Sequence, residues 1–69
     1  MVNVLLTSAG RRSYIVDYFK KTEGIGKVYA SNSNYTIALK WADGYFISPL
    51  IYSDNYISSV IDFCKKNDV

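Results

Sequence analysis

The chain has 69 residues, enough for one small domain, and its 49% hydrophobic and 20% charged residues are typical of folded proteins rather than disordered ones. Histidine is absent and Cys64 is the only cysteine. These absences exclude Ser-His-Asp and Cys-His nucleophile systems, His-ligated metals and an internal disulfide. A net charge of +2 is too small for the dense basic face of a nucleic-acid-binding domain.

We expect no targeting or membrane-spanning segment in these residues. No segment approaches the roughly 18 apolar residues of a membrane span. The apolar run at residues 4–6 is too short for a signal peptide, and the arginines follow it rather than precede it. A single unpaired thiol is typical of a reducing compartment, so we expect a cytoplasmic protein with no membrane or nucleic-acid partner.

The first half of the chain predicts a strand, a helix and a second strand. An unbroken apolar run indicates a buried strand at about residues 2–7. Residues 11–22 have helical periodicity, and their predicted apolar stripe consists of Tyr14, Ile15, Tyr18 and Phe19. The next strand is expected at about residues 27–31.

The second half continues the alternation. It predicts a helix at about residues 35–42, a strand at 45–48 that Pro49 ends, and a helix at 54–66. Strands that alternate with helices indicate an α/β fold with a small parallel sheet and right-handed crossovers.

Three strands make a small sheet, since four to six is the usual number, and a free sheet edge invites pairing with another strand. We therefore expect residues 1–69 to form the amino-terminal part of a longer polypeptide. The alternative is a 69-residue protein that self-associates, with the sheet edge as the place of contact.

The loop after the first predicted strand gives the strongest functional signal. Ligands of open α/β sheets bind outside the carboxyl ends of the strands, and the free N–H groups at a helix start attract anions. The small residues Ser8, Ala9 and Gly10 permit close approach of a phosphate or carboxylate. The segment lacks the three glycines of a dinucleotide fingerprint and the Gly-Lys-Ser/Thr of a P-loop.

Two adjacent arginines follow these small residues. Arg11 and Arg12 oppose the helix dipole, at a cost of about 0.3–1 kcal/mol each when exposed, whereas a bound anion would reverse that sign. Arg can hold phosphate or carboxylate through two parallel hydrogen bonds. The alternative is that the arginines are solvated or pair with an acidic group elsewhere in a longer protein.

Asn32 is a weaker candidate for the same site. It lies 22 positions after Gly10, roughly where dinucleotide-binding folds carry an acid for the ribose hydroxyls. An amide can hydrogen-bond a sugar or a polar substrate, but it lacks the double acceptor of a carboxylate.

Aromatic residues are expected to serve mainly in packing. Tyr14, Tyr18 and Tyr56 fall on apolar helix faces, and Trp41 has helical spacing from Ile37, which favours core or interface positions. The scattered carboxylates form no pair that acid–base catalysis or a magnesium site would need.

The order of several motifs resembles a known family. The opening segment Val4-Leu5-Leu6-Thr7-Ser8-Ala9-Gly10-Arg11-Arg12 is similar to the start of ATP-grasp enzymes related to the carbamoyl-phosphate synthase large chain. Weaker similarities follow in the same order at residues 30–34, 42–49, 54–57 and 64–66. The resemblance implies a Rossmann-like, three-layer pre-ATP-grasp domain at the amino terminus of an ATP-dependent ligase, in which a carboxylate is activated as an acylphosphate and an amine then displaces the phosphate.

The same resemblance implies roles for this chain and its partners. Ser8, Gly10, Arg11 and Arg12 would contact a small-molecule substrate or its phosphate, and Asn32 more weakly, because the family often has aspartate there. ATP and magnesium would bind to carboxyl-terminal ATP-grasp domains of the same polypeptide. The chain alone would hold no cofactor and would be inactive.

Two other functions stay open from the residues alone. One is a small nucleotide- or NAD-binding Rossmann module, and the other is a self-associating interaction domain without a ligand.

Overall fold

The computed structural model describes all residues 1–69, and it contains three strands and three helices in strict alternation. In chain order these are β1 (Val2–Leu6), α1 (Ser13–Lys20), β2 (Ile25–Asn32), α2 (Ile37–Trp41), β3 (Gly44–Ile47) and α3 (Tyr56–Lys66). The predicted α/β order is therefore confirmed, although each helix is shorter than expected. In particular, α1 begins at Ser13 rather than at residue 11, because the two arginines belong to the turn before it.

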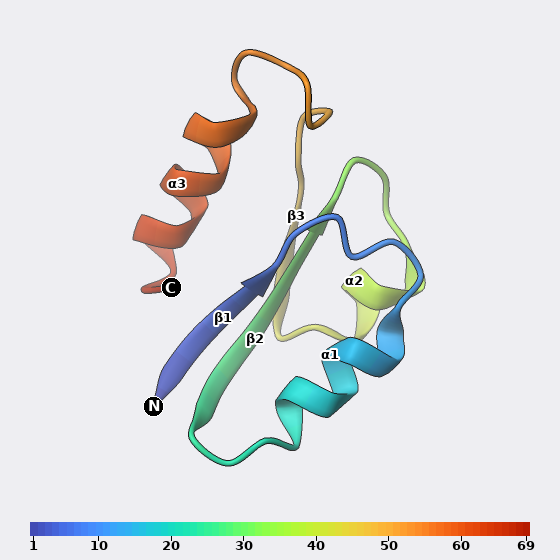
Figure 1. The fold of residues 1–69 in the computed structure, drawn as a ribbon, viewed down its shortest axis with the longest axis vertical. Helices are drawn as coiled ribbons and strands as arrows, with labels where there is room; N and C mark the ends of the chain where they lie inside the picture. Colours follow the sequence, from blue (N-terminus) through green and yellow to red (C-terminus); the bar gives the residue numbers. More distant parts are fainter.

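The three strands form one parallel sheet in the order β1-β2-β3, so β2 is central. The register pairs Leu6 with Ala30 on one side of β2 and Asn32 with Ile47 on the other. β1 and β3 each have one edge without a neighbouring strand. All three carboxyl ends lie at the same edge of the sheet, where the first loop begins (Figure 1).

Helices cover both faces of the sheet, which gives three layers (Figure 1). On one face, α1 and α2 enclose the main apolar cluster, whose buried members are Ala9, Val16, Val28, Ala30, Ala38 and Leu39. On the other face, the ring of Phe63 in α3 stacks on Phe46 at 4.5 Å between centroids and meets Tyr29 edge-on at 5.4 Å. The alternation of side chains along β2 explains this division, since Tyr29 lies between Val28 and Ala30 and points to the opposite face.

The carboxylate of Asp43, in the turn between α2 and β3, connects this turn to β2 and to α1. Asp43 accepts a hydrogen bond from the backbone N–H of Val28 through Oδ2 at 2.8 Å, and its own N–H donates to the Val28 carbonyl at 2.8 Å. The Lys20 ammonium donates to the carbonyl of Trp41 at 3.1 Å and lies 3.9 Å from Asp43 Oδ1. The turn after α2 is thereby fixed to both α1 and β2.

The expectation of core positions for aromatic helix residues is only partly correct. Tyr56 is buried, but Tyr14 and Tyr18 are 56% and 67% exposed and meet edge-on at 6.3 Å, and Trp41 is 55% exposed. The one fully buried side chain of α1 is Val16, which lies outside the predicted apolar stripe, although Phe19 of that stripe packs against the core. No helix is both long and apolar enough to cross a membrane.

Candidate functional site

The first loop (residues 7–12) leaves β1 at the carboxyl edge of the sheet and enters α1 (Figure 1). Its backbone has left-handed conformations at Ser8, with φ of 50°, and at Gly10, with φ of 58°. Only glycine adopts this region without strain, which accounts for Gly10. The two bends carry Ala9 back over the sheet, so that its N–H donates to the carbonyl of Ser31 at 3.0 Å and its side chain is buried.

Asn32 lies at the first loop, as its spacing from Gly10 predicts. Its Oδ1 accepts a hydrogen bond from the Gly10 N–H at 3.3 Å, and its Nδ2 donates to the carbonyl of Asn34 at 3.2 Å. Thr36 donates from its hydroxyl to the carbonyl of Gly10. Asn32 therefore positions the loop backbone, and one lone pair of Oδ1 and one hydrogen of Nδ2 remain without a protein partner.

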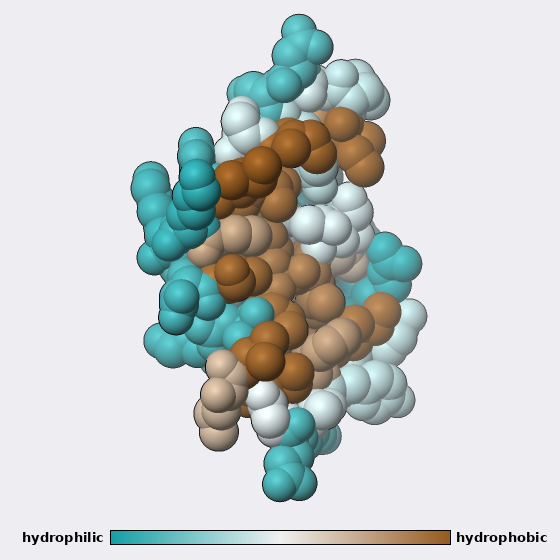
Figure 2. Space-filling view, turned by 60° about the vertical axis from the view of Figure 1, so that its left-hand side comes forward, coloured by the Kyte–Doolittle hydropathy of each residue, from teal (hydrophilic) through white to brown (hydrophobic).

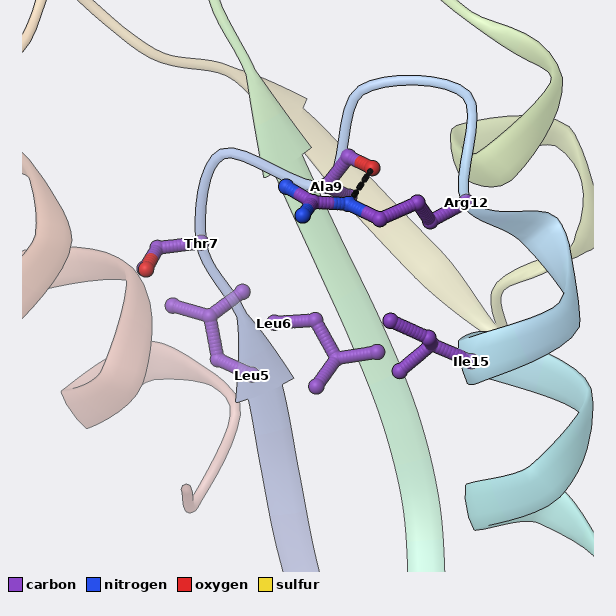
Figure 3. Close-up of a pocket in the computed structure, with 6 residues that line it drawn as sticks. All are labelled: Leu5, Leu6, Thr7, Ala9, Arg12 and Ile15. Carbon is purple, nitrogen blue, oxygen red and sulfur yellow. Dashed lines mark hydrogen bonds between the residues drawn. The ribbon is translucent and has the colours of Figure 1, made fainter.

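The two arginines have different surroundings. The guanidinium of Arg12 turns back over the loop, where Nε donates to the Ala9 carbonyl at 3.5 Å (Figure 3). Its Nη2 donates to the Ser8 carbonyl at 2.9 Å. Arg11 is exposed, and its side chain makes no hydrogen bond or ion pair with the protein. Arg12 thus fixes the loop, while Arg11 is free to bind a ligand.

Several backbone N–H groups at this end of α1 have no acceptor in the protein. Those of Ala9, Gly10, Arg12, Ser13 and Ile15 donate to groups of the chain itself. The N–H groups of Ser8, Arg11 and Tyr14 make no such bond. The first turn of α1 has no acidic residue and no side-chain cap, so the positive end of the helix dipole is not neutralised by the chain.

A pocket of about 310 Å³ lies beside the loop. It is mostly apolar and is lined by Leu5, Leu6, Thr7, Ala9, Arg12 and Ile15 (Figure 3). Arg12 extends along the rim of this pocket toward Ala9, above Leu6 and Ile15 (Figure 3). The pocket therefore combines apolar walls with one guanidinium, that of Arg12, whereas Ser8, Arg11 and Tyr14 do not line it.

The five predicted residues Ser8, Gly10, Arg11, Arg12 and Asn32 lie at one end of the sheet. Arg12 and Asn32 hydrogen-bond the loop backbone, whereas the side chain of Arg11 has no partner in the protein. Sequence reasoning missed Thr36, whose hydroxyl bonds the carbonyl of Gly10, 26 positions earlier in the chain. No sequence motif indicates this contact. It also missed the pocket, because Ile15 enters it from the helix. Nowhere do three of the Asp, Glu and Cys side chains gather so that they could hold a metal ion.

Comparison with known proteins identifies the family of the chain. The family model for the PylC-like, N-terminal domain matches residues 4–69, which include the whole first loop and all three helices. No curated protein matches the chain. Because the match covers almost the entire sequence, the chain belongs to the PylC-like N-terminal domain family, a pre-ATP-grasp domain of ATP-grasp ligases.

Proposed function

We propose that this chain is the substrate-side domain of an ATP-dependent carboxylate–amine ligase of the acylphosphate type, and that its first loop binds an anionic group of the substrate or its phosphate. The observation that carries the proposal is the set of free donors at the loop. Three backbone N–H groups without acceptors, those of Ser8, Arg11 and Tyr14, belong to the same short segment as the unpaired Arg11 side chain, where the first loop enters α1. Membership of a family of pre-ATP-grasp domains supports the reaction class.

Arg11 supplies the direct contact in this proposal. A hydrogen bond from a guanidinium to a carboxylate or phosphate contributes about 1.5–3 kcal/mol, and a bidentate pair also fixes the orientation of the anion. Ser8 adds an exposed hydroxyl and its free N–H. An anion here also reverses the unfavourable interaction of the arginines with the helix dipole.

In the proposed site the conformation of the loop backbone is maintained by Arg12, Gly10 and Asn32. Arg12 occupies the carbonyls of Ser8 and Ala9, which would otherwise repel an anion. Gly10 allows the left-handed bend, and Asn32 holds its N–H. In the proposed site these two carbonyls are therefore already hydrogen-bonded, whereas the N–H groups of Ser8, Arg11 and Tyr14 remain available to an anion.

We propose that ATP and magnesium bind to ATP-grasp domains of the same polypeptide and that the chain alone is inactive. For magnesium, the proposal is supported by the lack of any group of three Asp, Glu or Cys side chains that could hold a metal ion in this chain. We also propose a cytoplasmic location, which the single unpaired thiol supports.

Steady-state kinetics of the complete ligase polypeptide test the loop. The Arg11→Ala variant should raise KM for the anionic substrate about tenfold or more, as expected from losing one charge-assisted hydrogen bond. Lys40→Ala is the matched control, because it removes an exposed positive charge from α2, and it should leave KM unchanged. Equal kinetics of wild type and Arg11→Ala would reduce the arginine to surface charge.

Calorimetric titration of the 69-residue chain tests the proposal that ATP and magnesium bind to other domains. We expect no magnesium-dependent ATP binding, and micromolar affinity would contradict the proposal. Saturable binding of NADH that is lost in the Gly10→Asp variant would instead favour a dinucleotide-binding module.

A further inference from the structure

Apolar side chains are exposed on two sides of the molecule. Figure 2 turns toward the viewer the side on which β1 and α3 lie in Figure 1, and it shows an apolar band between hydrophilic margins. The second apolar surface belongs to β3, an outer strand of the sheet, where Tyr45 and Ile47 are 47% and 49% exposed. Tyr35, which is also exposed, packs edge-on against the ring of Tyr45 at 5.3 Å between centroids. Aromatic and aliphatic side chains therefore border the free edge of β3.

The backbone groups of β3 point alternately toward β2 and toward the free edge. Ser48 donates its N–H to the Asn32 carbonyl at 2.9 Å, and Asn32 lies opposite Ile47 in the register. In a parallel pair, a residue bonds to the two neighbours of the residue opposite it, so the groups of Phe46 and Ser48 face β2. The N–H and carbonyl groups of Tyr45 and Ile47 therefore point to the free edge, where the chain supplies no partner.

No charged side chain protects this edge. Residues 44–53 contain no Lys, Arg, Asp or Glu. Natural edge strands commonly carry charges that prevent pairing with another strand. An identical strand would bring no like charge against this segment, so a second copy of the chain fits the edge.

The outward groups of β3 are self-complementary in one antiparallel register. Antiparallel residues that face each other through their backbone groups exchange two hydrogen bonds. With Phe46 opposite Phe46 of a second copy, Tyr45 of each copy lies opposite Ile47 of the other, and every outward N–H gains an acceptor. A shift by two residues in one direction places Ile47 opposite Asp43, whose N–H is already bonded within the chain. A shift in the other direction places Tyr45 opposite Pro49, which has no N–H.

The same register brings apolar side chains together on both faces of the sheet. Tyr45 lies opposite Ala30 of the main apolar cluster, so Tyr45 and Ile47 project on the face that α1 and α2 cover. An aromatic side chain directly opposite a β-branched one is a favourable cross-strand pair. On the other face, Phe46, which stacks on Phe63 at 4.5 Å, meets Phe46 of the second copy.

We propose that two copies of this chain pair antiparallel through the free edges of β3 and form one continuous sheet. Phe46 lies at the two-fold axis, and Tyr45 of each copy packs on Ile47 of the other. The dimer doubles the three strands of the single chain, which gives a sheet within the usual range of about four to six strands. This interface uses no residue of the first loop and is independent of the proposed anion site.

Charges placed at the two outward positions test this register by sedimentation velocity. Tyr45→Lys with Ile47→Lys places like charges opposite each other, so it should raise the dissociation constant of the dimer about tenfold or more. Tyr45→Glu with Ile47→Lys is the matched control, because it changes the same two residues but places a carboxylate opposite an ammonium group. This control should still dimerise, and circular dichroism checks that both double variants are folded.

Hydrogen exchange of the wild-type chain supplies a test that needs no variant. Exchange at the Tyr45 and Ile47 amides should slow about tenfold or more from dilute to concentrated samples, as expected for amides that become hydrogen-bonded. Amides at the free edge of β1 should not change. A wild-type chain that stays monomeric at millimolar concentration would overturn the proposal. So would a dimer that protects β1 instead, persists in the double lysine variant, or is lost equally in both double variants.

Discussion

Replacement of Asp43 should remove a disproportionate share of the stability of this small fold. Its carboxylate is the acceptor for the backbone N–H of Val28 at 2.8 Å, and Val28 is completely buried. In the Asp43→Ala variant this N–H loses its acceptor at a position where the protein excludes water. A buried donor without a partner costs its full desolvation free energy.

The magnitude follows from these contacts. A hydrogen bond to a charged group contributes about 1.5–3 kcal/mol, and the ion pair of Asp43 with half-exposed Lys20 adds at most about 1 kcal/mol. At 0.05–0.15 kcal/mol per residue, the whole domain has about 3–10 kcal/mol of stability. We therefore expect Asp43→Ala to lower the free energy of unfolding by about 2–3 kcal/mol, and Asp43→Asn, which keeps an acceptor oxygen, by less than about 1 kcal/mol.

Urea unfolding monitored by circular dichroism gives both free energies, and hydrogen exchange of the Val28 amide reports on the bond itself. Exchange of this amide should accelerate in Asp43→Ala and stay slow in Asp43→Asn. The reasoning fails if the alanine variant is as stable as wild type, or if both variants lose stability equally while the Val28 amide remains protected.

Three further predictions concern the core, the first loop and the surface. Leu39→Ala should lower the free energy of unfolding by about 2–5 kcal/mol, because Leu39 is fully buried in the main cluster, and urea unfolding measures it. Asn32→Leu should accelerate hydrogen exchange at Gly10, whereas Asn32→Asp, which keeps the acceptor, should leave it slow. The hydrogen bond to Asp17, and then its charge, raise the pKa of Lys21. Because folding raises this pKa, the protonated Lys21 stabilises the folded state at pH values below the ordinary pKa of lysine, and this stabilisation is lost as the pH rises above it. Thermal unfolding followed over alkaline pH should therefore show a smaller fall in stability for Lys21→Met than for wild type.

Periodicity and turn residues were sufficient to predict the order of elements and the parallel sheet, because strand and helix repeats differ clearly in this chain. The buried side of α1 was harder to predict. Tyr14 and Tyr18 continue the apolar stripe in sequence, but nothing in the chain covers them. The periodicity of a helix shows which side is apolar, but burial also depends on which other elements pack against that side.

The candidate site shows the same division between local and non-local information. Spacing placed Asn32 at the first loop, but it could not reveal that its amide binds the Gly10 N–H rather than facing solvent. Nor could it separate the adjacent arginines, since Arg12 turns back only because the loop presents two carbonyls to it. Thr36 depends on where α2 docks, which is a tertiary property.

An NMR titration of the 15N-labelled chain with inorganic phosphate tests the central claim most directly. The account predicts saturable shifts at the backbone amides of Ser8, Arg11 and Tyr14, with weaker affinity in the Arg11→Gln variant. Shifts that never saturate, that spread equally to the lysines at the end of α3, or that persist unchanged without the Arg11 guanidinium would contradict it.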